Sequence, residues 1–169
     1  MFDLGLTKLA LILLDVFLWG VISLGSGYWF HRRPISRFDH DSCLTRLRPF
    51  EADGRVYERR LKILRWKDDL PEAGAMFAGG FSKARAVGRS TEYLERFVVE
   101  TRRAEVTHWV VMAAGPFFFL WNPWYAGVLM CVYAVVANVP FIVIQRYNRA
   151  RLHRILEGRR QRGVQVEPQ

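Results

Sequence analysis

The sequence predicts an all-α integral membrane protein with three transmembrane helices, the last two forming a tight helical hairpin. Two apolar runs lead to this fold class: residues 4–30 are almost wholly apolar, and residues 106–144 contain only a few polar side chains. A bilayer core of about 30 Å needs roughly 20 apolar residues in a helix, so the second run is long enough for two spans. The composition agrees, because 51% of the chain is hydrophobic and 14% aromatic. We expect a single membrane domain over residues 1–169.

The first predicted span covers about residues 4–30 and is followed by His31, Arg32 and Arg33. The alternative is a cleaved signal peptide, whose apolar region is only about 7–15 residues long and follows a basic start. This run is longer and does not begin with basic residues, so we expect a retained helix. Asp15 lies midway along it, where a carboxylate is costly. We therefore expect it to pack against another helix or against another copy of the chain in a homo-oligomer.

Residues 31–89 are predicted to form a cytoplasmic segment of short helices and loops, since they are too polar to span a membrane. One helix is expected from Arg55 to about Arg65, with a basic surface that lies on the membrane. Phe77 and Phe81 are expected to form a loop that contacts the membrane.

The longest predicted helix covers about residues 90–121 and contains the second span. Asn122 and Pro123 end this helix and start the next one, because Asn caps helices and Pro is tolerated at the first helical position. The third span covers about residues 124–146. A basic tail follows over residues 147–169.

The orientation follows from the basic residues that flank the three spans. These are Arg32, Arg33, Arg37, Arg102, Arg103, Arg146, Arg149, Arg151 and Arg154. The turn at residues 122–124 carries no charge. The positive-inside rule then places the N-terminus outside and the C-terminus in the cytoplasm, in the plasma membrane. The net charge of +9 is explained by these flanks and by anionic lipid or substrate, so we expect no nucleic-acid partner.

A polar layer is predicted where the hairpin approaches the cytoplasmic side. Glu105 and His108 are three residues apart and share one helix face. If the turn is centred near residue 123, equal rise along two antiparallel helices brings His108 level with Asn138, and Glu100 level with Arg146. Polar groups at this depth are costly unless they are paired or functional, so the layer predicts a pocket that opens inwards.

Three segments resemble the glycosyl-4,4'-diaponeurosporenoate acyltransferase family of staphyloxanthin-type carotenoid biosynthesis. They are ETRRAEVTHW at residues 100–109, ANVPFIVIQRYNRARL at 137–152 and, more loosely, RWKDDLPEAG at 65–74. The order of the motifs covers nearly the whole chain, although Ala150 stands where family members commonly have Pro. The resemblance implies transfer of a fatty acyl group to a sugar hydroxyl of a glycosylated carotenoid. The implied partners are an acyl donor (acyl-CoA, acyl-carrier protein or a phospholipid), a lipidic glycosylated acceptor and membrane lipid.

The mechanism that we associate with this resemblance makes His108 the general base, which takes a proton from the acceptor hydroxyl. Glu105 or Glu100 would orient His108 and stabilise its protonated form. Asn138 would donate to the developing oxyanion. Substrate binding is expected from basic, aromatic and amide side chains of the same segments, namely Arg146, Tyr147, Asn148, Arg149, Arg151, Arg103, Arg65, Trp66 and Lys67.

Two alternatives remain open at this point. A Glu-x-x-His pair on a helix is also half of a di-metal carboxylate site, so Glu105 and His108 would suit a metal-dependent lipid-modifying enzyme. The other histidines, His31, His40 and His153, lie outside the predicted spans, and we therefore expect no metal and no cofactor. The second alternative is a non-catalytic membrane subunit that docks a partner enzyme.

Overall fold

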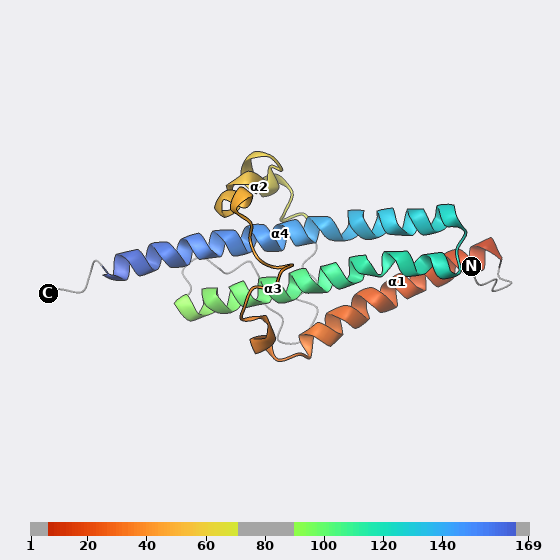
Figure 1. Cartoon of the computed structure of the whole chain (residues 1–169), viewed down its shortest axis with the longest axis horizontal. Coiled ribbons are helices and arrows are strands. Elements are labelled where there is room, and N and C mark those ends of the chain that lie inside the picture. Colours follow the sequence, from red (N-terminus) through yellow and green to blue (C-terminus); the bar gives the residue numbers. More distant parts are fainter. Residues whose placement is uncertain (1–6, 71–89, 165–169) are drawn as a thin grey trace. The chain divides into compact units, whose positions relative to one another are not determined.

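A computed structural model describes residues 7–70 and 90–164, and all regular structure in these ranges is helical (Figure 1). The α-helices described there are α1 (Lys8–His31), α2 (Arg55–Arg59), α3 (Thr91–Ala113) and α4 (Trp124–Val164). The 3-10 helices are η1 (Ile35–Phe38), η2 (Pro49–Gly54), η3 (Ile63–Arg65) and η6 (Gly115–Leu120). The predicted all-α class is therefore confirmed.

Two of these helices are long and apolar enough to cross a membrane. The segments are Lys8–His31, where an 18-residue stretch has a mean hydropathy of 2.1, and Trp124–Arg162, where such a stretch has a mean hydropathy of 2.3. Only 11% of this 18-residue stretch in the first segment is buried within the protein, so its apolar side chains are largely left for another apolar environment. The predicted second span, on α3, does not meet the same test, and the three-span topology stays a prediction.

Three helix boundaries differ from the prediction. The helix α3 ends at Ala113 and is followed by the 3-10 helix η6, because Pro116 has no backbone N–H to continue an α-helix. The expected helix from residue 55 to 65 is wrong, since α2 ends at Arg59 and Lys62 adopts a left-handed conformation with φ 49°. The helix α4 continues through the predicted basic tail to Val164, with Pro140 inside it. The predicted loop with Phe77 and Phe81 lies outside the described residues.

The chain divides into two compact units, and each is described by itself. The first unit comprises residues 1–33 and 106–142, and the second comprises residues 34–105 and 143–169. Both α3 and α4 contribute to both units.

The first unit is built around Trp19 of α1. Its ring stacks on Phe118 with a centroid distance of 4.7 Å, and its Nε1 donates to the sulfur of Met130 at 3.2 Å. Val111 and Ala134 complete this buried core, so α1 packs beside the end of α3 and the first part of α4, as Figure 1 shows.

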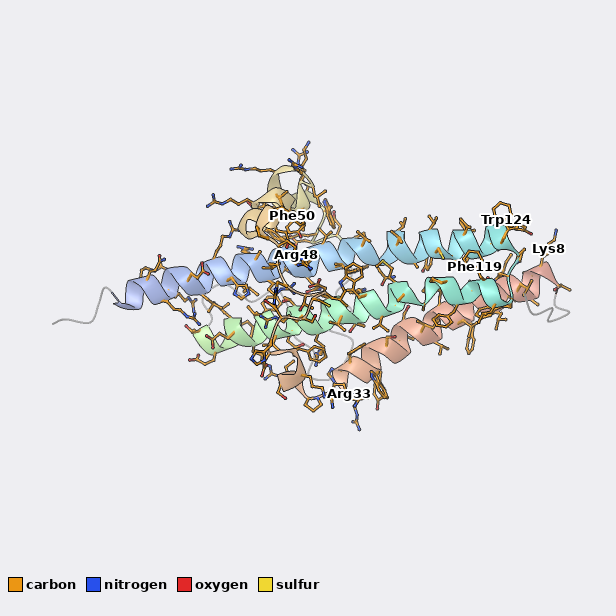
Figure 2. The ribbon with its side chains drawn as sticks, viewed as in Figure 1. Lys8, Arg33, Arg48, Phe50, Phe119 and Trp124 are labelled. Atoms are coloured by element: carbon orange, nitrogen blue, oxygen red, sulfur yellow. The ribbon has the colours of Figure 1, made fainter. Side chains whose placement is uncertain are left out.

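The ends of the first unit carry different side chains. Lys8, Phe119 and Trp124 lie at one end, and Arg33 lies at the other (Figure 2). Arg33 stacks over the ring of Trp29, with its guanidinium carbon 3.9 Å from the ring centroid. Aromatic and basic side chains at the two ends of an apolar helix are typical of residues that sit at membrane interfaces.

Asp15 confirms the expected packing contact. Its side chain is 6% exposed, and Oδ1 accepts hydrogen bonds from Trp121 Nε1 at 2.8 Å and Asn122 Nδ2 at 2.9 Å. The carboxyl group therefore fastens α1 to the turn that precedes α4. Both donors belong to the same chain, so this contact requires no second copy.

The second unit has two apolar clusters along α4. One joins α3 to α4 and contains Leu94, Phe97, Val98, Leu152 and Leu156. The other joins the short helices to α4 and contains Tyr57, Ile63, Ile144 and Tyr147. In Figure 1, α2 lies against this part of α4.

Gly54 allows the close approach of α2 to α4. It has φ 88°, and an added Cβ would lie 3.2 Å from Cβ of Ala150. Both the backbone conformation and the space favour glycine here. The approach positions the segment before α2 against the face of α4 that carries the charge pairs described next.

Candidate functional site

Glu105 lies at the middle of a buried charge cluster in the second unit. Its Oε1 accepts from Arg146 Nη1 at 2.7 Å, and its Oε2 accepts from Arg149 Nη2 at 2.5 Å. The side chains of Glu105 and Arg149 are 0% exposed. Arg146 and Arg149 are three residues apart on α4, so both project from one helix face towards α3. One carboxylate thereby holds two arginines.

Glu51 is the second carboxylate of this cluster. Arg146 donates two hydrogen bonds to Glu51, from Nε to Oε1 and from Nη2 to Oε2, both at 2.8 Å. The backbone N–H of Arg48 and the hydroxyl of Tyr57 also donate to Glu51. Together Glu51, Glu105, Arg146 and Arg149 form what we call the arginine–carboxylate centre, in which two positive and two negative charges balance.

The electrostatics follow from these contacts. Burial by itself raises the pKa of Glu51, but the hydrogen bonds from Arg146, Arg48 and Tyr57 outweigh it and hold the pKa below its usual value. Burial and the bond to Glu51 raise the pKa of the Tyr57 hydroxyl. At neutral pH Glu51 is therefore ionised and Tyr57 is protonated and able to donate.

Backbone carbonyl groups complete the surroundings of the two arginines. Arg146 donates to the carbonyl oxygens of Leu44 at 2.9 Å and Arg46 at 2.8 Å, and Arg149 donates to that of Thr45. The carbonyl groups of three successive residues, 44–46, thus receive their hydrogen bonds from α4. The arginine–carboxylate centre therefore holds this irregular segment against α3 and α4, which is a structural role.

Two buried donor atoms in the described part of the chain lack a partner. They are Nε of Arg149 and Nδ2 of Asn148. Unpaired buried donors are costly, at about 1–3 kcal/mol each. Because they belong to adjacent residues, this stretch of α4 carries unused hydrogen-bonding capacity.

Arg102 fastens a second segment to α3. Its Nε donates to Asp41 Oδ1 at 2.6 Å, and its Nη1 donates to the carbonyl oxygens of Asp39 at 3.0 Å and Phe38 at 3.4 Å. The predicted inner flank of the second span is thus used in tertiary contacts. Arg103 pairs with Glu100 on the same helix at 2.5 Å.

His108 and Asn138 meet in the first unit, as predicted from the hairpin. His108 Nδ1 lies 3.0 Å from Asn138 Oδ1, and Asn138 Nδ2 donates to the carbonyl oxygen of Ala134 at 2.8 Å. The imidazole also stacks on Phe141, with a centroid distance of 4.8 Å and an interplanar angle of 7°. The levelling of His108 with Asn138 is confirmed.

The companion expectation placed Glu100 level with Arg146, but the two side chains bind other partners. Arg146 binds Glu51 and Glu105, whereas Glu100 binds Arg103. An arginine side chain is long and flexible, so the height of its Cα on a helix does not fix the partner of its guanidinium. A histidine is short, and its Cα height is a better guide.

The remaining predicted substrate-binding residues are spread over several surroundings. Arg65 and Arg151 are exposed, Lys67 pairs with Asp68, and Trp66 Nε1 donates to the carbonyl oxygen of Leu61 at 2.9 Å. Tyr147 is buried and donates to Glu58 at 3.1 Å. The RWKDDLPEAG segment is described only as far as Leu70.

Sequence reasoning missed Glu51, Tyr57 and Thr45, which are all buried around the centre. Glu51 follows Pro49 in a stretch with no helical period, so nothing marked it as an interior residue. One signal was available, because a buried arginine pair on one helix face needs more than the single carboxylate of Glu105 to balance its charge.

Within residues 7–70 and 90–164, no group of three or more histidine, cysteine, aspartate or glutamate side chains is placed to hold a metal ion. The metal-dependent alternative therefore gains no ligand set from the described residues. Glu105, one half of the proposed pair, directs both its oxygens to arginines.

The described features define a helical protein with two apolar helices suited to a membrane. Its α3 and α4 helices are joined by the polar contacts of His108 with Asn138 and of Glu105 with Arg146 and Arg149. The model of the glycosyl-4,4'-diaponeurosporenoate acyltransferase family matches residues 29–158, so the chain belongs to this family and is an acyltransferase. Glycosyl-4,4'-diaponeurosporenoate acyltransferases of Staphylococcus aureus strains USA300 and Newman are each 26% identical over 145 residues, covering 86% of this chain and 87% of the relative. No solved structure is significantly similar to the chain.

Proposed function

We propose that this acyltransferase moves a fatty acyl group onto a hydroxyl of a glycosylated carotenoid or related glycolipid at the cytoplasmic membrane interface, with His108 as general base. Family membership supports the reaction type, and the names of the relatives suggest the acceptor class. The observation that carries the base assignment is the hydrogen-bonded pair of His108 and Asn138.

This pair supports one tautomer of the imidazole. Because Asn138 Nδ2 donates to a backbone carbonyl, its Oδ1 must face His108 and can only accept. His108 Nδ1 is then the donor, and the lone pair of the neutral ring lies on Nε2. Asn138 positions the base through Oδ1. Its Nδ2 carries two N–H groups, of which one donates to Ala134, and the second is proposed to donate to the developing oxyanion.

The proposed reaction follows. Nε2 of His108 takes the proton of the acceptor hydroxyl while the hydroxyl oxygen attacks the acyl carbonyl carbon. The tetrahedral intermediate expels the leaving group of the donor, which receives the proton from His108, and an ester bond remains. The negative charges of Glu105 and Glu100, on the same helix, are proposed to stabilise the imidazolium in addition to binding their arginines.

Donor binding is proposed to involve basic residues of the same motifs. Arg151 and Arg65 are exposed and are the best placed for the anionic part of acyl-CoA, an acyl-carrier protein or a phospholipid. Arg103 and Lys67 are partly buried and already paired, and are proposed as secondary contacts. Arg146 and Arg149 support the fold of this region, since their guanidinium groups are engaged by Glu51 and Glu105.

The test of the base uses purified full-length protein in lipid nanodiscs, a radiolabelled acyl donor and a glycosylated acceptor. His108→Ala should lower turnover by about 10²–10⁴-fold, the usual contribution of a general base. His40→Ala, at an exposed histidine, is the matched control and should retain activity. Retention of more than about a tenth of the activity by folded His108→Ala would exclude the assignment.

We also propose the three-span topology with an external N-terminus and a cytoplasmic C-terminus. Cys43 is an exposed natural thiol in the segment predicted to be cytoplasmic. In a Cys131→Ser background, a membrane-impermeant maleimide should label Cys43 in inverted membrane vesicles. It should not label Cys43 in intact cells, even when the layers outside the plasma membrane have been made permeable to the reagent. Labelling from the outside would reverse the orientation.

A further inference from the structure

A pocket of about 390 Å³ lies in the first unit between α1 and α4. Its wall includes Ile12, Asp15, Val16 and Gly20 from α1, and Met130 and Tyr133 from α4. Ile12, Val16 and Tyr133 are 59%, 66% and 50% exposed on the surface of this unit. The pocket is therefore an opening in an apolar surface, of a size found in small-molecule sites.

Asp15 is the group that makes this pocket more than an apolar hollow. Its side chain is more than nine-tenths buried, and both of its hydrogen bonds go to Oδ1. Among the described residues, no donor reaches Oδ2. The buried side-chain atoms without a partner are those of Asn148 and Arg149, so Oδ2 of Asp15 is not fully enclosed. Because Asp15 lines the pocket, we infer that Oδ2 faces it.

We propose that this pocket binds an apolar chain that carries one hydroxyl group, as in a long-chain alcohol, with the hydroxyl donating to Oδ2 of Asp15. A carboxyl oxygen in apolar surroundings is costly unless it is given a donor. Trp121 and Asn122 hold Oδ1 and thereby fix the direction of Oδ2. The apolar chain of the ligand covers the exposed side of Ile12 and Val16. The site uses no group of the proposed transfer reaction.

Two glycines of α1 offer a matched pair of variants. Gly20 lines the pocket, Gly25 does not, and an added Cβ meets nothing within 4 Å at either position. Gly20→Leu therefore adds a side chain to the pocket lining from a Cβ that meets open space, while Gly25→Leu adds the same side chain elsewhere on the helix. The comparison separates occupation of the pocket from a general effect on α1.

The probe is a dodecyl alcohol that carries a photoreactive diazirine, and its methyl ether is the comparison because it cannot donate a hydrogen bond. Full-length protein in nanodiscs is irradiated with each probe, and the labelled peptides are identified by mass spectrometry. The alcohol should label peptides with residues 12–23 and 130–133 at concentrations at least about tenfold lower than the ether, the difference expected when a buried acceptor gains or lacks its donor.

Gly20→Leu should abolish labelling by the alcohol, and Gly25→Leu should leave it unchanged. Asp15→Asn keeps an acceptor for Trp121 and Asn122 but replaces Oδ2 with an amide, so the preference for the alcohol should fall to within about twofold. Equal labelling of the wild type by alcohol and ether would overturn the proposal. Unchanged labelling of Gly20→Leu would do the same, as would labelling of other peptides in place of these.

Discussion

Glu105 Oε2 lies 2.5 Å from Arg149 Nη2, and neither side chain is exposed. Removal of one partner from such a buried pair leaves an uncompensated charge, which costs about 3–5 kcal/mol. We expect Glu105→Gln to lower the free energy of unfolding by this amount. Chemical denaturation of the protein in detergent, followed by tryptophan fluorescence, measures the change.

Glu95→Gln is the control for this substitution on the same helix. Glu95 lies 3.4 Å from Arg160, and both side chains are at least half exposed. Exposed pairs contribute only about 0–1 kcal/mol, so little change is expected. A double variant, Glu105→Leu with Arg149→Met, should recover part of the stability lost by either single change. If the two losses add instead, the pair is not the source of the effect.

The centre also predicts a dependence of stability on pH. The pKa of Glu51 is lower in the folded protein than its usual 4.5, so the unfolded chain takes up a proton first as the pH falls. This contribution to stability is present above about pH 4.5 and is lost progressively below it. The melting temperature should therefore fall between about pH 5 and pH 3. Glu51→Gln should be less stable than the wild type at neutral pH, and its melting temperature should depend less on pH in this window. Glu95→Gln should keep the pH dependence of the wild type. An unchanged slope in Glu51→Gln would assign the acid sensitivity to other carboxylates.

Gly115 predicts a steric effect in the first unit. A Cβ at this position would lie 3.1 Å from Cβ of Ala134 and 3.3 Å from the Cα of Cys131. Gly115→Leu should therefore destabilise the protein by about 1–3 kcal/mol through overpacking. Gly25→Leu, which meets open space, should stay within about 0.5 kcal/mol of the wild type. Gly115→Ala adds only the Cβ, and the stability that it loses should be partly restored by adding Ala134→Gly. If the second substitution restores nothing, the contact with Ala134 is not the cause of the loss.

Much of the architecture was predictable because it depends on local patterns. Apolar runs at helical length defined α1 and the first part of α4, and the Asn122-Pro123 turn gave the hairpin. The end of α3 was less accessible, since Gly115 and Pro116 convert the helix to a 3-10 turn. The expected helix beyond Arg59 was wrong because the irregular segments fold on α4, and their own period did not show it.

By itself, the sequence determined the apolar helices, the family motifs and the meeting of His108 with Asn138. The last follows from chain connectivity, because a short turn between antiparallel helices fixes which short side chains are level. Only the tertiary structure decided that Glu51 joins Glu105 in balancing Arg146 and Arg149. Long arginine side chains and an irregular segment choose their partners by three-dimensional charge balance, which no spacing along the chain encodes.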